Sequence, residues 1–165
     1  MTLEETLAQI KPLDKNAMDV AAKRWDSIAK PLHSLGKMEK LVIQIAGITG
    51  NPDMKLQKRA LVPMCADNGV VEEGVTQTGQ EVTAIVAENF LSGATSACVM
   101  SRQCGTKVIP VDIGMAVDTK VSKELKVAYG TANMTKGPAM TRAQAVQALE
   151  AGIEMVRRLK EEGYG

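Results

Sequence analysis

The chain has 165 residues, close to the length of one domain, and its apolar fraction of 45% is ordinary for a globular protein. Its 20 basic and 19 acidic residues leave a net charge of +1, and it has only one Trp, two Tyr and one Phe. It therefore lacks both the basic excess and the aromatic surfaces that are typical of nucleic-acid-binding proteins. Because the longest apolar run, residues 60–66, is far too short to span a bilayer and the N-terminus has no apolar signal core, we expect a cytoplasmic protein that is not bound to a membrane.

Three helices are expected in the N-terminal third of the chain. The first covers residues 3–10, and the second starts after Asp14, a residue type favoured as an N-cap, and runs to about Ala29. A third helix follows residues 34–36 and ends near Gly50, with apolar residues at helical spacing: Met38, Leu41, Ile45 and Ile48. Residues 51–58 are expected to form a polar connection.

Two apolar runs, Arg59–Asp67 and Lys107–Gly114, are expected to be strands of a parallel sheet that are buried on both faces. Pro63 and Pro110 count against this interpretation, because proline lacks the N–H group that a central strand donates. Between the two runs, helices are expected over about residues 78–91 and 94–103.

After the second run, residues 124–129 are expected to form a third, short strand. Thr141 and Gln144 have the spacing of a capping box, which predicts a helix to about Glu162. Its expected apolar face consists of Ala145, Leu149, Gly152, Val156 and Leu159. The alternation of strands and helices predicts an α/β fold, a parallel sheet covered by helices, preceded by an N-terminal helical segment.

Both predicted strands end in an aspartate that is followed by glycine within two residues. Ligands of open parallel sheets bind outside the carboxyl ends of the strands, so Asp67 and Asp112 are expected at one crevice, where they could accept hydrogen bonds from ribose hydroxyls or hold loop amides. The alternative is that Asp and Asn simply favour turns. The loop over residues 130–140, with Lys136, could likewise hold an anion at a helix N-terminus or be only a connection.

The sequence indicates no metal site and no nucleotide-binding fingerprint. The three cysteines, Cys65, Cys98 and Cys104, form no C-x-x-C pair, and the single histidine, His33, makes a poor zinc set with them. We expect reduced thiols and no metal.

Four segments, in order along the chain, resemble the nicotinate-nucleotide:dimethylbenzimidazole phosphoribosyltransferase family. KPLHSLGKME at residues 30–39 is similar to the family's K-P-P-G-S-L-G-R-L-E, and MCADNGV with EGV at residues 64–75 is similar to M-C-A-D-H-G-V…E-G-V. VDIG at residues 111–114 and GPAMTR at residues 137–142 match V-D-V-G and G-P-A-M-S-R. The resemblance covers about residues 3–160.

This resemblance implies an enzyme of cobalamin nucleotide-loop assembly. Such an enzyme moves the phosphoribosyl group of nicotinate mononucleotide onto a lower-ligand base such as dimethylbenzimidazole, and it releases nicotinate and an α-ribotide without a metal or redox cofactor. The family fold is a Rossmann-like parallel sheet with a small helical domain, usually in a homodimer. Residues 1–50 would then belong to the small domain and residues 51–165 to a partial α/β domain.

Family members are about twice as long as this chain. The resemblance places their general-base glutamate and a G-E-[LM]-G-[IM]-x-N-T phosphate loop beyond Gly165, so no catalytic residue is expected here and we expect a truncated chain that is inactive alone. One alternative is a non-catalytic half of a heteromeric transferase, a heterodimer that acts on phenolic acceptors. Another is a plain α/β ligand-binding module.

The family's base pocket contains a serine and a glutamine, which the alignment places at Thr78 and Val86. Thr78 keeps the hydroxyl, whereas Val86 removes an amide. We therefore hypothesise a preference for phenolic or less polar acceptors, unless another residue takes the position of the amide. The expected substrate-binding residues are Asp67, Asn68, Gly69, Thr78, Val86 and Asp112.

Overall fold

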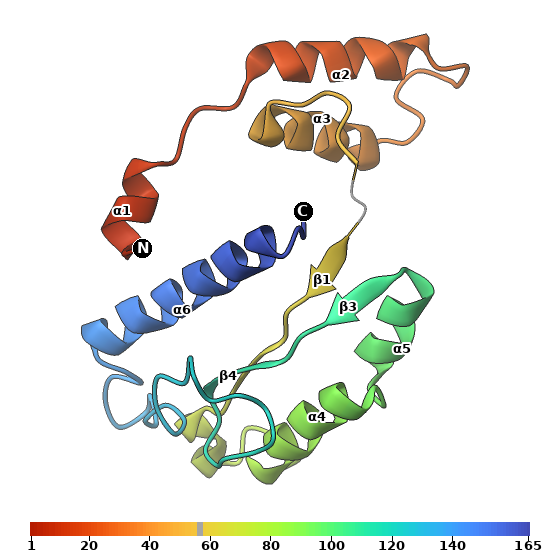
Figure 1. Cartoon of the computed structure of the whole chain (residues 1–165). Helices are drawn as coiled ribbons and strands as arrows, with labels where there is room; N and C mark the ends of the chain where they lie inside the picture. Colours follow the sequence, from red (N-terminus) through yellow and green to blue (C-terminus); the bar gives the residue numbers. More distant parts are fainter. Residues whose placement is uncertain (56–57) are drawn as a thin grey trace. The chain divides into compact units, whose positions relative to one another are not determined.

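The computed structural model describes residues 1–55 and 58–165 (Figure 1). It divides into two compact units, a helical unit of residues 8–56 and an α/β unit of residues 1–7 with 57–165. The polar connection expected over residues 51–58 lies partly outside the described residues. Because the two units are not placed relative to each other, each is described by itself.

The helical unit is a pair of helices, α2 (Lys15–Ser27) and α3 (Lys37–Thr49), joined by a loop. The predicted N-cap is confirmed, because Ala17 donates its N–H to the Asp14 carboxylate at 3.0 Å. The helices approach closely through small buried residues, and a Cβ on Gly47 would lie 2.7 Å from the Met18 side chain. The larger apolar residues at helical spacing on α3, namely Met38, Leu41 and Ile48, are exposed.

A buried carboxylate closes the loop between α2 and α3. Glu39 pairs with the Lys30 ammonium at 2.8 Å and accepts the N–H of Leu35 at 3.1 Å. The hydrogen bond from Lys30 holds the pKa of Glu39 below its ordinary value. In the same loop His33 has φ +58°, a left-handed conformation, at the position where the family signature has glycine.

The α/β unit is built on two short parallel pairs (Figure 1). Strand β1 (Arg59–Leu61) pairs with β3 (Thr106–Val108), and β2 (Met64–Ala66) pairs with β4 (Val111–Gly114). Each run that we predicted as one strand is therefore split at its proline. Hydrogen bonds of 2.9 Å from the N–H groups of Ile109 and Val111 to the carbonyls of Leu61 and Pro63 continue the ladder across the break.

Burial on both faces is correct for β4 but wrong for β1. Val111, Asp112 and Gly114 are buried, whereas Arg59 and Leu61 are exposed. Within the first run Cys65 of β2 is buried because it belongs to the core beneath α4, whereas the residues of β1 do not belong to that core.

Two helices, α4 (Glu81–Ser92) and α5 (Ser96–Gln103), connect β2 to β3 after a 3-10 turn at Gly69–Glu73. Among the described residues, the stretch 81–103 has the length and mean hydropathy of a membrane-spanning helix, but it is broken at Gly93, where φ is +77°. A small core lies beneath α4 and contains Cys65, Ala87, Met115 and Val121, with Phe90 packed against it.

The third predicted strand is wrong, because residues 124–129 form no strand. Val127 and Gly130 donate to the carbonyls of Ile113 and Gly114 at 3.1 Å, so the segment follows the outer edge of β4. The two donors are three residues apart instead of two, and a regular ladder cannot form with that spacing.

The predicted capping box is confirmed at the start of helix α6 (Arg142–Glu161), which lies near α1 (Leu3–Ala8) in this unit. The predicted apolar face of α6 is wrong at Leu149 and Val156, whereas its other members, Ala145, Gly152 and Leu159, are half-buried. Its buried residues are Ala151 and Met155, whereas Leu149 and Val156 are 55% and 67% exposed.

Candidate functional site

A pocket of about 360 Å³ opens beside the carboxyl end of β2. One wall is β2 with the turn that follows it, and the other is the loop before α4 with the first half of that helix. We call it the β2 pocket, and its lining includes four of the residues predicted from the sequence: Asp67, Asn68, Thr78 and Val86.

The pocket wall contains a polar residue that the sequence analysis missed. The side-chain amide of Gln80 lies 3.3 Å from the carbonyl oxygen of Asn68, to which it donates. Gln80 lines the same pocket as Val86, on the turn just before α4. The pocket therefore contains a side-chain amide although Val86 has none. Gln80 is the candidate for the residue that takes the position of the family's glutamine.

Gly69 is a point of close backbone approach and does not line the pocket. It donates its N–H to the Thr131 hydroxyl at 3.1 Å, and an added Cβ would lie 2.6–2.7 Å from backbone atoms of residues 131–133. Asp67, only 4% exposed, accepts the N–H of Ala116 at 2.7 Å. These contacts fasten the turn after β2 to the segment that follows β4.

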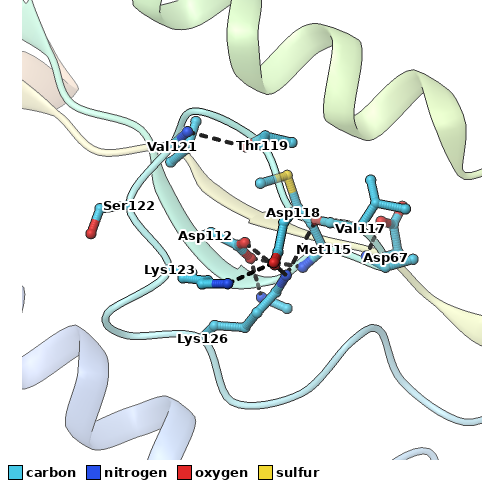
Figure 2. A network of polar contacts seen from close by, with 12 residues as sticks. Asp67, Asp112, Met115, Val117, Asp118, Thr119, Val121, Ser122, Lys123 and Lys126 are labelled. Carbon is cyan, nitrogen blue, oxygen red and sulfur yellow. Dashed lines mark hydrogen bonds and ion pairs between the residues drawn. The ribbon is translucent and has the colours of Figure 1, made fainter.

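Asp112 is fully buried and lines neither pocket described here, so the expectation that both aspartates face one crevice is wrong for Asp112. One carboxylate oxygen accepts the N–H groups of Gly114 and Met115 at 3.0 and 2.8 Å. The other forms an ion pair with Lys126 at 3.0 Å (Figure 2). The aspartate that ends β4 therefore stabilises a turn and a buried cation.

Lys126 makes most of the contacts in this polar network. Its ammonium also contacts the Asp118 carboxylate and the Val117 carbonyl, both at 3.2 Å, and lies 3.9 Å from the centre of the Tyr129 ring. Burial alone would lower the pKa of Lys126, but the contacts with Asp112 and Asp118 raise it above its ordinary value. Hydrogen bonds from Lys123 and Lys126 lower the pKa of Asp118 to about 2.

The buried thiol of Cys65 lies near both aspartates. Burial, followed by the negative charges of Asp112 and Asp67, raises the pKa of this thiol. Cys65 therefore stays protonated, the form that neither attacks carbon nor ligates a metal. Among the residues that the structure describes, no three His, Cys, Asp or Glu side chains gather as a metal site.

A second, larger pocket of about 610 Å³ lies under the N-terminus of α6. Three of the segments that carry the family resemblance meet in it, because its lining includes Ala66, Ile113 with Gly114, and residues 138–142. Lys136, the candidate for holding an anion, is not part of the lining. It forms an exposed ion pair with Glu72 at 3.0 Å, which gives it a partner within the chain.

Comparison with known proteins shows the same relationship along the whole chain. The DBI_PRT family model, described as phosphoribosyltransferase, matches residues 10–165. The chain is 49% identical to the nicotinate-nucleotide–dimethylbenzimidazole phosphoribosyltransferase of Clostridium tetani over 98% of its own length and 45% of that protein. It is 46% identical to the protein of that name from Ruminiclostridium cellulolyticum, over 99% of its own length and 47% of that protein.

Solved structures agree with the sequence matches. The crystal structure of the transferase of the same name from Thermus thermophilus superposes with a TM-score of 0.81 at 35% identity. The superposition covers 92% of this chain and 47% of that one. The chain thus spans slightly less than half the length of the relatives it matches.

Proposed function

Because the chain belongs to the DBI_PRT phosphoribosyltransferase family, we propose that it forms the acceptor side of a site that transfers the phosphoribosyl group of nicotinate mononucleotide to a lower-ligand base. The products would be nicotinate and an α-ribotide of dimethylbenzimidazole or a related acceptor, in cobalamin nucleotide-loop assembly. The β2 pocket carries this proposal, since its lining includes Asn68, Thr78 and Val86 at the carboxyl end of a parallel strand.

The chemistry of the transfer explains what such a pocket must do. Cleavage of the glycosidic bond leaves positive charge on the ribose, while the nicotinate ring departs as a neutral pyridine nitrogen. The acceptor must be held in line with that bond and must lose its proton. In the proposed site Thr78 and Gln80 orient the acceptor, while Asp67, Gly69 and Asp112 hold the surrounding loops in position.

We propose no catalytic residue in this chain, and the proton-accepting carboxylate would come from polypeptide that corresponds to the uncovered part of the relatives. The reaction as written needs no metal or redox cofactor. We further propose a cytoplasmic dimer, with residues 1–50 contributing to a small helical domain and residues 51–165 to a partial α/β domain.

Nicotinate release tests this proposal. The chain is incubated with nicotinate mononucleotide and dimethylbenzimidazole, alone and together with a polypeptide that comprises the part of the C. tetani relative it does not cover. We expect nicotinate and α-ribotide, measured by liquid chromatography, only when both polypeptides are present. Release by the chain alone would overturn its proposed inactivity, and a stable complex without release would overturn the transferase assignment. Release of nicotinate with phenol but not with dimethylbenzimidazole would favour the alternative of a heteromeric transferase that acts on phenolic acceptors.

The same assay tests the acceptor preference. Val86→Gln adds an amide to the pocket wall, and it should raise the dimethylbenzimidazole-to-cresol rate ratio by about tenfold, the effect of roughly one hydrogen bond of 1.4 kcal/mol. Val86→Leu is the matched control, since it enlarges the side chain without an amide. If Gln80 already supplies the amide, Val86→Gln leaves the ratio unchanged and Gln80→Leu lowers it, which would contradict the hypothesis about Val86.

A further inference from the structure

The loop over residues 130–140, a predicted candidate for holding an anion, lies with its first half against the turn that follows β2. Thr131 donates its N–H to the carbonyl oxygen of Asp67 at 3.0 Å. The Thr131 hydroxyl accepts the N–H of Gly69 at 3.1 Å. These two bonds fix the start of the 3-10 turn Gly69–Glu73, and a different residue of the loop, Asn133, holds its end.

Asn133 has a buried side chain whose polar atoms are all used within the chain. It is 8% exposed, and its amide nitrogen donates to the Glu73 carboxylate at 2.6 Å. The same nitrogen lies 3.5 Å from the Glu72 carboxylate, and the amide oxygen accepts the N–H of Thr135 at 3.1 Å. A hydrogen bond to a charged acceptor is roughly twice as strong as one between neutral groups. Asn133 therefore fastens the end of the turn to the loop.

An exposed ion pair joins the same two segments. Lys136 contacts Glu72 at 3.0 Å, with the two side chains 68% and 65% exposed. Exposed pairs of this kind contribute little to stability, because water competes for both charges. The buried bond of Asn133 is therefore the contact that decides where the turn ends.

The turn separates the two walls of the β2 pocket. Asn68 precedes the turn and lines one wall, whereas Thr78 follows it and lines the other. Directly after Glu73 the chain passes through Gly74 with φ +69°, so the path toward Thr78 starts from the point that Asn133 holds. Asn133 itself lines neither the β2 pocket nor the larger pocket, and its effect on the wall must pass through Glu73.

We propose that Asn133 is a positioning residue for the acceptor: through Glu73 it sets where Thr78 lies relative to Asn68, and so how tightly the β2 pocket holds a planar base. The identity of that base rests on the proposed function, whereas the link from Asn133 to the pocket walls concerns this chain alone. Asn133→Asp places a carboxylate against Glu73 and breaks the link. Asn133→Asp combined with Glu73→Gln restores a hydrogen bond in which donor and acceptor are exchanged.

Amide hydrogen exchange followed by NMR tests the link. Val71 and Gly74 donate the N–H groups that close the turn, so Asn133→Asp should speed their exchange by at least about tenfold. Adding Glu73→Gln should bring the rates back to within about threefold of the unaltered chain. Val111, which donates to Pro63 in the same unit, should stay unchanged.

Unchanged exchange at Val71 and Gly74 in a folded Asn133→Asp chain would overturn the proposal. Equal acceleration at Val111 would overturn it too, because it would show a general loss of stability instead of a local one. If Asn133→Asp does not fold, Glu73→Ala makes the same measurement, since it removes the acceptor at a side chain that is 39% exposed.

Binding of dimethylbenzimidazole to the chain gives a second readout, followed through the amide resonance of Thr78. We expect Asn133→Asp to weaken the binding by at least about fivefold and the added Glu73→Gln to recover it. Met134→Asp is the matched control, because it adds the same charge to the same loop at a position that is 60% exposed, and it should leave the affinity unchanged.

Equal affinities of Asn133→Asp and the unaltered chain would contradict the positioning role while leaving the proposed function in place. No response of Thr78 to the base in the unaltered chain would instead contradict the proposed function. The exchange rates at Val71 and Gly74 would then decide whether Asn133 holds the turn.

Discussion

At the scale of single residues, Gly69 shows how one missing side chain holds two loops together. Its hydrogen bond to Thr131 brings the turn after β2 against the backbone that follows residue 130. The contact is possible only because nothing projects from the glycine Cα. The family resemblance predicts Gly69 as a substrate-binding residue, whereas in the structure it lies behind the pocket wall, where it fixes the position of Asn68.

Gly69→Ala should therefore be costly. The added methyl would lie 2.6–2.7 Å from backbone atoms of Thr131, Ala132 and Asn133, and backbone atoms cannot rotate away as a side chain can. We expect a loss of about 1–3 kcal/mol in the free energy of unfolding, measured by urea denaturation. Gly137→Ala is the matched control, because no atom lies within 4 Å of its added Cβ. Equal stability of the two variants would show that residues 131–133 are not held against Gly69.

At the scale of elements, the loop after β4 depends on a single buried cation. The Lys126 side chain is 6% exposed and Asp112 is fully buried, so each is the counter-charge that makes burial of the other tolerable. The loop also carries Ala116, the donor to Asp67. The ion pair therefore stabilises the pocket wall indirectly, through the hydrogen bond between Ala116 and Asp67.

Lys126→Met tests this role. Removing the cation leaves the Asp112 carboxylate buried without a counter-charge, which costs about 3–5 kcal/mol for a buried pair. Urea denaturation should show this loss, and Asp112→Asn combined with Lys126→Met should recover a large part of it. Lys123→Met is the control, since Lys123 is exposed and pairs with the same Asp118, and it should change stability little. If the double variant were no more stable than Lys126→Met, the two residues would not act as a pair.

The elements that the sequence predicted correctly are those with local signals. Asp14 and the pair Thr141 with Gln144 act within one helical turn, and both caps are confirmed. The predictions failed where the decisive contact is distant along the chain. Whether residues 124–129 form a strand depends on their register against β4, and the buried face of α6 depends on which elements cover it. Lys126 lies fourteen residues after Asp112, a separation that fits no periodic spacing, so no pattern could identify the pair.

At the scale of the whole molecule, the order of the family motifs along the chain predicted the fold better than the periodicity of apolar residues did. Segments that are separate in the sequence meet around the end of β2, and Ala66 lines both pockets there. The sequence predicted a single crevice, whereas the structure has two pockets there. The alternation of strands and helices predicts where the sheet ends, but it does not predict how the loops divide the space at that end. Gln80 escaped prediction for the same reason, since its position on the pocket wall follows from the path of residues 69–80 and not from a motif.

The decrease in the free energy of unfolding at low pH is also a property of the whole chain. Hydrogen bonds from Lys or Arg side chains lower the pKa of five carboxyl groups spread over both units, namely Glu39, Glu72, Asp118, Glu124 and Glu154. For Asp118 and Glu154 the folded-state pKa is about 2, whereas the unfolded values are near 4. Between these values the unfolded chain binds more protons than the folded chain does, so acid favours unfolding.

We therefore expect the urea midpoint to stay level from about pH 7 to about pH 5 and to fall steadily as the pH drops toward about 2, where the folded carboxylates take up protons. Far-UV circular dichroism across a pH series measures the midpoint. Glu154→Gln removes one of the two groups with the lowest pKa and should make the fall shallower. Since most of these ion pairs are exposed, about 1 M salt should flatten the curve as well, because it shortens the screening length to roughly 3 Å. A midpoint that rises as the pH falls below about 4 would mean that these carboxylates are not charged and paired in the folded chain.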